Sequence, residues 1–326
     1  MKIAYTCSKP GSSNSWYRSS GVIPKLKMLN KFIEVELLNE IAWFYMADAD
    51  ILHILNPYEQ TSFIAANMAK DYGLKLWIDL DDDVLNVPPN HPESEKFCNY
   101  NFKQIIWKLM EMADAVSVPT ESIKNSLMNY NKNIHVIPNA FNDYNCKLSE
   151  MRSNKQIISW RGSKTHKDDL KTVKKALVEL SEKYPHVVFN FLGDPDGHYH
   201  VTDDMPNRNI MKAIATLDYF KYMSFLAPGI QIHPLEDNEF NRGKSNIAWI
   251  EGAAAGAVCV MPKLPEFEKP GCLTYSTDID FTAIIQDIIS NSGKYDGCFF
   301  ESKKYIEENL MLSEVNKLRL NLIEGL

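Results

Sequence analysis

Two cations separated by a single residue, Arg242 and Lys244, stand in a polar loop of the 326-residue sequence. Ser245 follows them, and its hydroxyl could accept an early backbone N–H and so cap a helix beginning there. The N-terminal end of a helix carries unpaired N–H groups and a partial positive charge. Two cations beside such an end would form a site for phosphate, and especially for a diphosphate. Glu251, about two turns further along that helix, could accept hydrogen bonds from ribose hydroxyls.

The surrounding residues must supply the helix and the strand that hold these groups. Ile247, Ile250 and Ala254 recur at helical spacing, and Gly256 stands where a glycine commonly ends a helix. The apolar run 257–261 then predicts a buried parallel strand. A different interpretation of the same stretch is an ordinary amphipathic helix whose charges are solvated.

A glycine-containing turn joins a predicted strand to a predicted helix in each half of the chain. In the first half it contains Gly11, and in the second half it contains Gly162 and Ser163. Because glycine has no side chain, backbone N–H groups there can approach a phosphate. A strand, a glycine turn and a helix begin a doubly wound α/β domain, whose ligands bind at the carboxyl ends of the strands. Arg18, at the start of the first such helix, could reach a phosphate or an acceptor, or could be an ordinary surface arginine.

The run Asp79–Asp83 contains four aspartates at the end of a predicted strand. An Asp-x-Asp at a strand end can hold Mn²⁺ or Mg²⁺ and so neutralise a diphosphate. The basic pair named above would already supply that positive charge. We therefore expect no metal site, with metal binding and structural capping kept as alternatives.

Two histidines receive different interpretations. His91 lies on a proline-rich loop, and because loops at the edge of a sheet often carry binding residues, we assign it to the acceptor side. His53 lies inside a predicted strand, where a histidine is usually structural.

Alternating strands and helices predict two doubly wound α/β domains. The first domain is predicted over residues 1–142 and the second over 155–302, with a linker between them and a last segment, 303–326, that crosses back to the first domain. The predicted strands are 2–7, 32–38, 49–55, 74–79, 115–118, 134–137, 156–160, 187–192, 210–212, 229–232 and 257–261. The predicted helices are 18–30, 57–72, 99–112, 121–130, capped by Thr120, and then 168–183, 217–225, 278–292 and 303–323.

Composition is that of an ordinary soluble globular protein, with 45% hydrophobic and 24% charged residues. The net charge of −7 gives no overall basic surface for nucleic acid. The six cysteines are scattered, with no C-x-x-C pair, which favours reduced thiols and a cytoplasmic location. The first residues predict a strand and not a signal peptide, and no apolar run approaches the length that spans a membrane.

The segment carrying Arg242, Lys244 and Glu251 resembles the donor-sugar motif of GT-B glycosyltransferases, especially the retaining kind and those of phages and bacteria. Residues 113–120 and 134–139 likewise resemble the end of the first domain in that family. The resemblance implies two Rossmann-like domains facing across a cleft. It also implies that the basic pair grips a nucleotide diphosphate and that Glu251 holds the ribose. One difference is that Gly243 stands where the family often has a first glutamate, which is absent here or displaced to Glu236 or Glu239.

The resemblance implies a hexosyl- or pentosyltransferase that uses a nucleotide-diphosphate sugar as co-substrate, with retention of configuration and without metal or another cofactor. Arg242 and Lys244 are the expected catalytic residues. The expected donor-binding residues are Gly162, Ser163, Arg242, Lys244, Ser245 and Glu251. The expected acceptor-side residues are Gly11, Arg18, Asp81, Asp82 and His91.

The acceptor is left open by the sequence. The resemblance to phage enzymes suggests that the acceptor is hydroxymethylated pyrimidine in DNA and that the protein acts in the host cytoplasm. A protein that binds DNA needs a row of basic side chains, a cationic track, to contact the phosphates. The track would comprise Lys9, Arg18, Lys25, Lys27, Arg161, Lys164 and Lys167. The net charge and the Asp79–Asp83 run argue instead for a cell-surface glycan or a small molecule. A non-catalytic nucleotide-binding GT-B protein and a sugar-phosphate epimerase are further alternatives, and the oligomeric state is not predicted.

Overall fold

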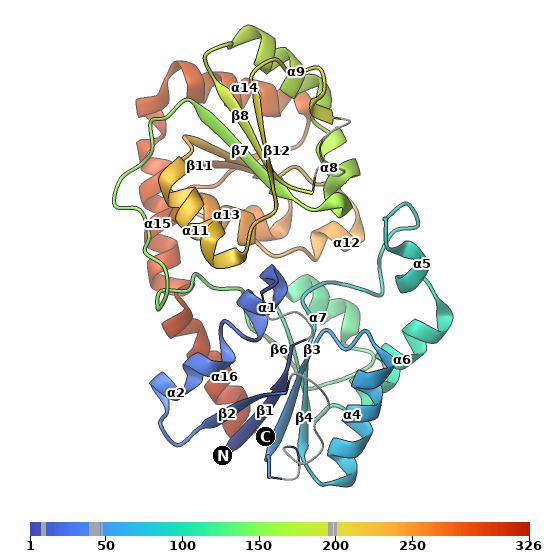
Figure 1. Ribbon diagram of the computed structural model, residues 1–326. Coiled ribbons are helices and arrows are strands. Elements are labelled where there is room, and N and C mark those ends of the chain that lie inside the picture. Colours follow the sequence, from blue (N-terminus) through green and yellow to red (C-terminus); the bar gives the residue numbers. More distant parts are fainter. Residues whose placement is uncertain (8–10, 39–45, 47, 195–197, 199–200) are drawn as a thin grey trace. The chain divides into compact units, whose positions relative to one another are not determined.

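The computed structural model of the chain describes all residues except 8–10, 39–45, 47, 195–197 and 199–200 (Figure 1). The chain divides into two compact units. The first unit comprises Met1–Tyr144, Gly243–Ser245 and Leu310–Leu326, and the second comprises Asn145–Arg242 and Asn246–Asn309. No helix among the described residues is long and apolar enough to cross a membrane.

The first unit contains a six-stranded sheet in which every neighbouring pair is parallel. Its strand order is β2-β1-β3-β4-β5-β6. The strands are β1 (Lys2–Thr6), β2 (Glu34–Leu38), β3 (Ile51–Leu55), β4 (Lys75–Asp79), β5 (Ala115–Val118) and β6 (Ile134–Val136). Strands β3 and β5 are buried along their whole length, as expected for a parallel sheet covered on both faces.

The helices of the first unit cover the two faces of this sheet. They are α1 (Ser13–Arg18), η1 (Ile23–Lys25), α2 (Leu26–Leu29), α4 (Gln60–Asp71), α5 (Ser94–Phe97), α6 (Tyr100–Met112), α7 (Glu121–Leu127) and α16 (Leu312–Glu324). On one face, η1, α2 and α16 pack over a core shared with β1, β3 and β4. Helices α4 and α6 pack against β4.

The second unit contains another six-stranded parallel sheet, in the order β12-β11-β10-β7-β8-β9. The strands are β7 (Ile157–Gly162), β8 (Val188–Gly193), β9 (Arg208–Lys212), β10 (Ile230–Ile232), β11 (Val258–Pro262) and β12 (Leu273–Tyr275). The helices are η2 (Lys164–His166), α8 (Lys167–Lys171), α9 (Lys174–Lys183), α11 (Thr216–Leu226), α12 (Glu239–Arg242), α13 (Ile247–Ala254), η3 (Pro265–Phe267), α14 (Asp278–Ser290), η4 (Ser292–Tyr295) and α15 (Asp296–Asn309). The predicted doubly wound α/β class is thus confirmed for both units.

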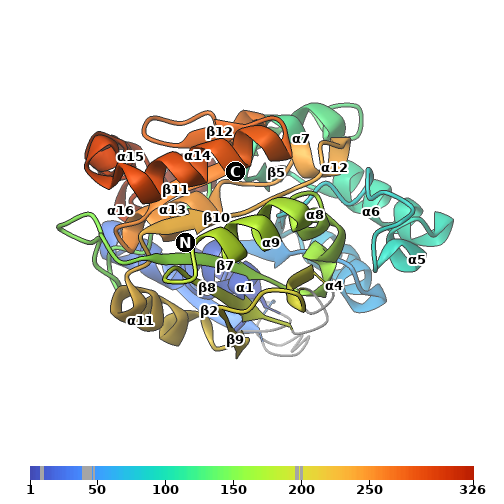
Figure 2. The ribbon, with the colours of Figure 1, turned by 90° about the horizontal axis from the view of Figure 1, so that it is seen from above.

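Successive side chains of a strand point to opposite faces of the sheet, so their contacts show which face each helix of the second unit covers. Helices α9 and α14 pack against each other (Figure 2). They share an apolar core with Ile230 and Ile232. Helix α13 packs on the other face, where a Cβ on Gly252 would lie 2.5 Å from the side chain of Gln231. The close approach of α13 to β10 therefore depends on that glycine.

Three helices predicted as continuous are each broken in the structure. The predicted helix 18–30 is wrong, because α1 already ends at Arg18 and a separate 3₁₀ turn begins at Ile23, with Pro24 as its second residue. The predicted helix 168–183 divides into α8 and α9. The predicted helix 303–323 divides where Met311 forms a β-bridge with Phe141, so that Leu310 O and Leu312 N both bond to Phe141, at 2.8 Å each.

The predicted linker 143–154 does not stand apart from the second unit. Ser149 N donates to Ala254 O at 2.8 Å, and Ser153 N donates to Gly256 O at 2.7 Å. Residues from Asn145 onward therefore belong to the second unit.

Candidate functional site

The carboxyl edge of the second unit's sheet is shaped by two neighbouring glycines. Gly162 ends β7 and is paired with Gly193, which ends β8. A Cβ on Gly193 would lie 1.8 Å from Gly162 O, and a Cβ on Gly162 would lie 2.4 Å from the Trp160 ring. Only backbone can occupy this edge. Ser163, the next residue, caps η2 by accepting a hydrogen bond from Thr165 N at 3.3 Å.

Asp169 joins two segments at this same edge. Its Oδ2 lies 2.9 Å from His166 Nδ1, in the turn after β7. Its Oδ1 accepts hydrogen bonds from Glu236 N at 2.9 Å and from Asn241 Nδ2 at 2.8 Å, in the segment after β10. The imidazole of His166 also meets that of His233 edge-on, with ring centroids 5.2 Å apart.

This histidine–aspartate cluster was not predicted from the sequence. The available signal was the spacing of His166 and Asp169, three residues apart after a strand–glycine turn, which places both side chains on one face of a helical turn. That signal is weak by itself. The contacts to Glu236 and Asn241 cannot be found from local spacing.

Arg242 is the last residue of α12, and its side chain is exposed. It holds Asp237 through two hydrogen bonds, from Nε at 2.7 Å and from Nη2 at 3.1 Å. The hydrogen bonds and charge of Arg242 lower the pKa of the Asp237 carboxyl. A phosphate that binds to Nε and Nη2 of Arg242 would replace this carboxylate.

Lys244 belongs to the first unit, whereas Arg242 belongs to the second. Lys244 Nζ lies 2.8 Å from Asp82 Oδ1. The segment around it is anchored by Thr120 Oγ1, which donates to Gly243 O at 3.1 Å. The predicted basic pair is therefore divided between the two units.

The predicted capping role of Ser245 is wrong. The helix α13 begins at Ile247, its N-cap residue is Asn246, and no side chain caps it. The Ser245 hydroxyl instead accepts a hydrogen bond from Asn139 Nδ2 at 2.9 Å. Gly256 follows the end of α13 with a φ of +89°, a left-handed conformation that favours glycine and confirms its predicted place.

Glu251 is buried in α13 and holds an arginine that the sequence analysis placed elsewhere. Arg161 Nε lies 2.5 Å from Glu251 Oε2, and Arg161 Nη2 lies 2.9 Å from Oε1. Tyr219 donates its hydroxyl to Oε2 at 3.1 Å. Burial, and then the negative charge of Glu251, raise the pKa of Tyr219. The carboxylate of Glu251 therefore already accepts three hydrogen bonds. Its role in binding a ribose stays a prediction.

In the first unit, Arg18 is completely buried, which overturns both interpretations made from the sequence. Its Nε and Nη2 bond to the two oxygens of Asp79, at 2.8 and 2.9 Å, and its Nη1 bonds to Ile137 O at 2.5 Å. Ser117 donates to the same carboxylate. Burial alone would raise the pKa of Asp79, but the Arg18 guanidinium holds it well below its usual range. Arg18 is therefore neither a surface residue nor placed to meet a ligand.

His53 and Arg319 lie beside this ion pair. His53 Nε2 is 3.9 Å from Asp79 Oδ2, and its ring packs edge-on against Trp77 at 4.5 Å. Burial lowers the pKa of His53, in agreement with a structural histidine. Burial also lowers the pKa of Arg319 to about 9.

The remaining aspartates of the acidic run differ from Asp79. Asp81 N donates to Asn56 Oδ1 at 3.2 Å, and Asn56 has a left-handed φ of +48°. Burial and the neighbouring Asp82 raise the pKa of Asp81 to about 7. Asp83 is buried and accepts from Asn86 Nδ2 at 2.8 Å. Among the described residues, no three His, Cys, Asp or Glu side chains form a group that could hold a metal ion.

The other acceptor-side candidates lie on separate segments of the first unit. Gly11 is in an exposed turn. His91 Nδ1 accepts a hydrogen bond from Glu93 N at 3.2 Å, which fixes the turn that contains it. Lys9, a member of the suggested cationic track, lies outside the described residues.

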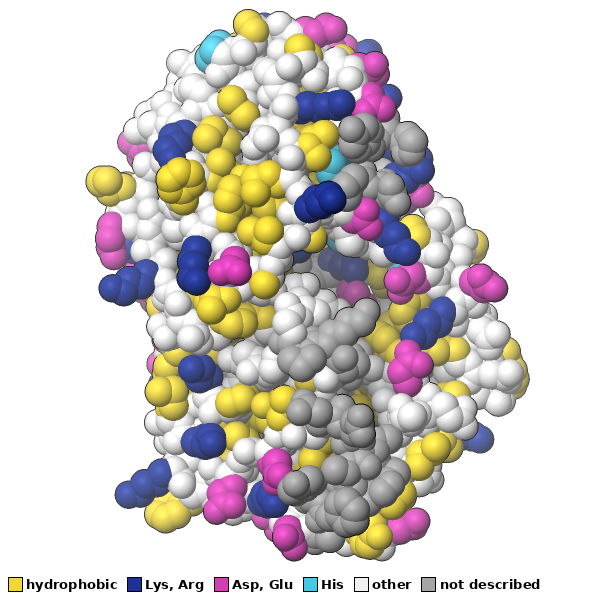
Figure 3. All heavy atoms as spheres, viewed as in Figure 1, with side chains coloured by type: hydrophobic (Ala, Val, Ile, Leu, Met, Phe, Trp, Pro, Cys, Tyr) yellow, Lys and Arg dark blue, Asp and Glu magenta, His cyan; other side chains and the backbone are white. Residues whose placement is uncertain are grey.

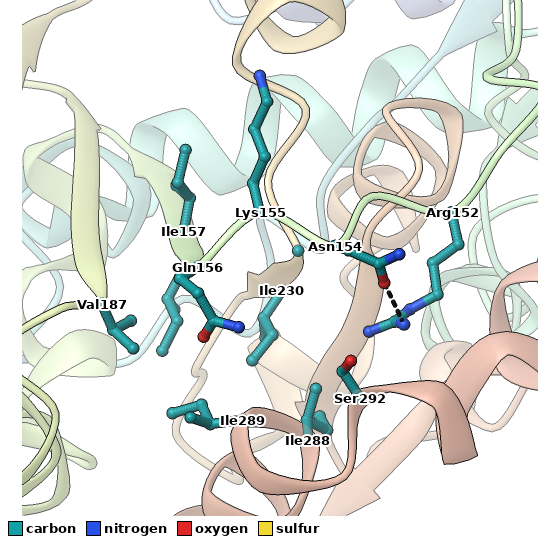
Figure 4. Close-up of a pocket in the computed structure, with 12 residues that line it drawn as sticks. Arg152, Asn154, Lys155, Gln156, Ile157, Val187, Ile230, Ile288, Ile289 and Ser292 are labelled. Carbon is teal, nitrogen blue, oxygen red and sulfur yellow. Dashed lines mark hydrogen bonds between the residues drawn. The ribbon is translucent and has the colours of Figure 1, made fainter.

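A small hollow in the second unit lies at the opposite, amino edge of its sheet. It is lined by Ile157 at the start of β7, Ile230 at the start of β10 and Ile288 of α14. Arg152 donates to Asn154 at its rim, at 2.8 Å (Figure 4). Because ligands of doubly wound sheets bind at the carboxyl edge, this hollow is not the candidate site.

Comparison with solved structures identifies the fold. HepE of Anabaena, in complex with UDP-glucose, is 14% identical, with a TM-score of 0.69 over 100% of both chains. A glycosyltransferase from Rickettsia africae is 16% identical, with a TM-score of 0.63 over 98% of this chain and 96% of that one. The lipopolysaccharide outer core galactosyltransferase WaaB is 15% identical, with a TM-score of 0.59 over 98% and 99%.

The chain has the GT-B fold. No protein-family model and no curated protein sequence matches it, so the likeness is one of structure at low identity. The two sheets of this GT-B fold carry different groups at their carboxyl edges. The first sheet carries Asp79–Asp83, and the second carries Gly162, Gly193 and the cluster around Asp169.

Proposed function

We propose that this protein transfers a sugar from a nucleoside-diphosphate sugar to an acceptor hydroxyl. The proposal rests on the carboxyl edge of the second unit's sheet. There, Gly162 and Gly193 leave room only for backbone. His166, held by Asp169, and helix α12, which ends at Arg242, belong to the same edge. Backbone N–H groups together with basic side chains suit a diphosphate. HepE, which has the same fold, binds UDP and UDP-glucose, which supports a donor of this class.

The proposed chemistry assigns charge stabilisation to Arg242 and Lys244. As the bond between sugar and phosphate breaks through an oxocarbenium-like state, the departing diphosphate gains negative charge. Fixed cations then stabilise the transition state more than the ground state. Each cation holds an aspartate in the structure, Asp237 or Asp82, and we propose that donor phosphate takes the place of these carboxylates. Glu251 is proposed to hold the ribose.

A thermal-shift panel tests the donor. Sugars linked to UDP, GDP, ADP and dTDP are compared with and without divalent ions, because a ligand that binds the folded state raises the midpoint of unfolding. We expect one nucleotide to stabilise the protein as its diphosphate sugar and as its free diphosphate. A panel in which every nucleotide sugar leaves the midpoint unchanged at millimolar concentration would contradict the proposed function.

Retention of configuration is a finer part of the proposal and rests on the resemblance of the segment 242–256 to retaining enzymes. The test is proton NMR of the newly formed glycoside, whose anomeric coupling constant reports its configuration. An α-linked donor should give an α-linked product. A β-linked product would show inversion and would direct attention to Asp81 as a base, because its pKa of about 7 suits proton abstraction near neutral pH.

For the acceptor we favour a hydroxyl of a glycan or small molecule over hydroxymethylated pyrimidine in DNA. Arg18 is buried, and Arg161 is paired with Glu251, so two members of the suggested cationic track are already engaged. On the face drawn in Figure 3, basic side chains of the described residues are interspersed with acidic ones. A gel-shift and transfer assay on duplex containing 5-hydroxymethylpyrimidine tests this preference. Salt-sensitive binding with transfer of sugar to that duplex would overturn it.

Two alternative functions remain testable with the same donor. A non-catalytic nucleotide-binding protein would be stabilised by the nucleotide sugar but would neither transfer nor hydrolyse it. An epimerase would exchange the C2 proton of the sugar with solvent, so incubation in D₂O would place deuterium at C2. We expect release of nucleoside diphosphate that depends on an acceptor hydroxyl, and no deuterium at C2.

A further inference from the structure

The His166 ring is held from one side at the carboxyl edge of the second unit. Within the described residues, its hydrogen bond runs through Nδ1 to Asp169. About a seventh of its side chain is exposed (15%), and the Nε2 edge points away from the atom that Asp169 contacts because the two ring nitrogens lie on opposite sides of the imidazole. The ring is thus fixed in place with one nitrogen left for a partner.

Asp169 is itself unable to turn away from the ring. Its other oxygen accepts hydrogen bonds from Glu236 N and Asn241 Nδ2 at 2.9 and 2.8 Å, and its side chain is only 9% exposed. A carboxylate on Nδ1 requires that this nitrogen carry a proton. With Asp169 on Nδ1 and a bound anion at Nε2, the imidazole would lie between two acceptors and donate a hydrogen bond to each. The arrangement therefore leaves the Nε2 side of His166 for an anionic partner.

The charges around His166 favour an anionic partner. Asn241, which Asp169 also binds, directly precedes Arg242 in the chain, so the same carboxylate orders the segments of both groups. Lys164 and Lys167 flank the histidine in sequence. Two acidic residues nearby have cationic partners, since Asp168 pairs with Lys171 and Asp237 with Arg242. Asp194 and Glu236 also lie at this edge, where their backbone N–H groups bond to Gly162 O and Asp169 Oδ1. His233, the other titratable group against the ring, is a second imidazole.

We propose that His166 donates a hydrogen bond from Nε2 to the distal phosphate of a nucleoside diphosphate, with Asp169 as its positioning residue. This inference rests on the proposed function. It adds a contact between His166 and the distal phosphate to those proposed for Arg242, Lys244 and Glu251. The distal phosphate is the part of the leaving group that carries the most charge. A charge-assisted hydrogen bond to it makes the site prefer a diphosphate to a monophosphate.

Two substitutions of the same residue separate the two ring nitrogens. His166→Asn keeps an amide nitrogen near the position of Nδ1, within reach of Asp169, but ends before the position of Nε2. His166→Gln extends its amide to the position of Nε2 but cannot also satisfy Asp169. Calorimetry measures the dissociation constants of UDP and UMP, or of the matching pair for whichever nucleotide the thermal-shift panel selects.

We expect His166→Asn to weaken the diphosphate by about tenfold or more, the usual effect of losing one hydrogen bond to a charged group. Its affinity for the monophosphate should stay near that of the wild type, so the preference between the two collapses. His166→Gln should retain more of the preference than His166→Asn does. Asp169→Asn should reduce the preference for the diphosphate over the monophosphate. In NMR spectra of the wild type, the His166 Nε2 resonance should shift when the diphosphate binds. That resonance is assigned by its absence from the spectrum of His166→Gln.

The outcomes distinguish this inference from the proposed function. A wild type that binds no nucleoside diphosphate overturns both. A wild type that binds the diphosphate, together with a His166→Asn variant that prefers it over the monophosphate as strongly, overturns the inference and leaves the function standing. Equal loss of both nucleotides in all three variants would assign to His166 and Asp169 a purely structural role.

Discussion

Arg161 and Glu251 form a doubly hydrogen-bonded ion pair that joins β7 to α13 in the second unit, at 2.5 and 2.9 Å. Glu251 is only 2% exposed, and Tyr219 supplies a third hydrogen bond. The carboxylate that the sequence assigns to a ribose is thus also a link between a strand and a helix. Its substitution should change two measurements, stability and donor affinity, for different reasons.

We expect Glu251→Gln to lower the free energy of unfolding by about 1–3 kcal/mol, because it leaves the Arg161 guanidinium with a weaker partner. If Glu251 also holds the ribose, the donor dissociation constant should rise in the folded variant. Urea unfolding and calorimetry measure the two effects. Tyr219→Phe is the matched control, since it removes one hydrogen bond to the same carboxylate. An unchanged donor affinity beside a lower stability would limit Glu251 to the structural role.

Arg18 and Arg319 are both completely buried but should respond oppositely to replacement by methionine. Arg18→Met leaves the Asp79 carboxylate buried without its cation, and should cost about 3–5 kcal/mol of unfolding free energy. Arg319 Nε and Nη2 make no hydrogen bond among the described residues. Arg319→Met removes a costly buried charge, so we expect a neutral effect or a gain of up to about 2 kcal/mol. Similar losses in the two variants, measured by urea unfolding, would contradict this account.

Asp81 should make the protein less stable as the pH rises. Its pKa is about 7 in the folded protein against 3.8 ordinarily, so between these values the folded state binds more protons than the unfolded state. Stability therefore falls from about pH 4 to about pH 7 through this group. Asp81→Asn should gain at least about 1 kcal/mol at pH 8 and nothing near pH 4. Chemical unfolding at the two pH values tests this, and a gain of the same size at both would show another cause.

Asp82→Asn is the companion experiment to the previous one. Removing its charge should lower the pKa of Asp81, because Asp82 is the neighbouring charge that raises it. The pH-dependent part of the stability should then shrink. Lys244 loses its carboxylate partner in this variant, so a separate loss of stability is expected at pH 8.

Arg242→Ala and Lys244→Ala should each reduce kcat/KM. We expect a loss of at least about 2 kcal/mol in transition-state stabilisation, by analogy with other groups that neutralise developing charge. Lys294→Ala is the matched control, because Lys294 also pairs with an aspartate, Asp287, but lies in η4, which follows α14. Wild-type turnover in both active-site variants would remove the basic pair from the mechanism.

Activity should persist in excess EDTA, because the proposed site neutralises the diphosphate with side chains alone. The assay compares initial rates of transfer with and without chelator, after dialysis against it. Complete loss of activity, restored by Mn²⁺ and abolished by Asp81→Asn, would instead assign metal binding to the acidic run after β4.

The alternation of strands and helices could be predicted from the sequence because its signals are local. Apolar runs with β-branched residues, glycine turns and capping residues act over a few positions. Thr120, for example, was expected to cap a helix and does so, accepting from Ile123 N at 3.3 Å. Breaks within helices were harder to predict from the sequence. The break at Met311, for example, depends on a β-bridge to Phe141, which lies far away in the chain.

The two doubly wound sheets, and the segments that reach their carboxyl edges, could be predicted from the sequence. Which side chains meet at those edges could not, because it depends on contacts between distant parts of the chain. Arg18 and Asp79 are 61 residues apart, Asp169 and Asn241 are 72 apart, and Asp82 and Lys244 are 162 apart. Local periodicity fixes the face of a strand on which a residue lies. Which distant residue lies next to it on that face depends on strand order and helix packing, and these form only when the whole chain buries its apolar surface.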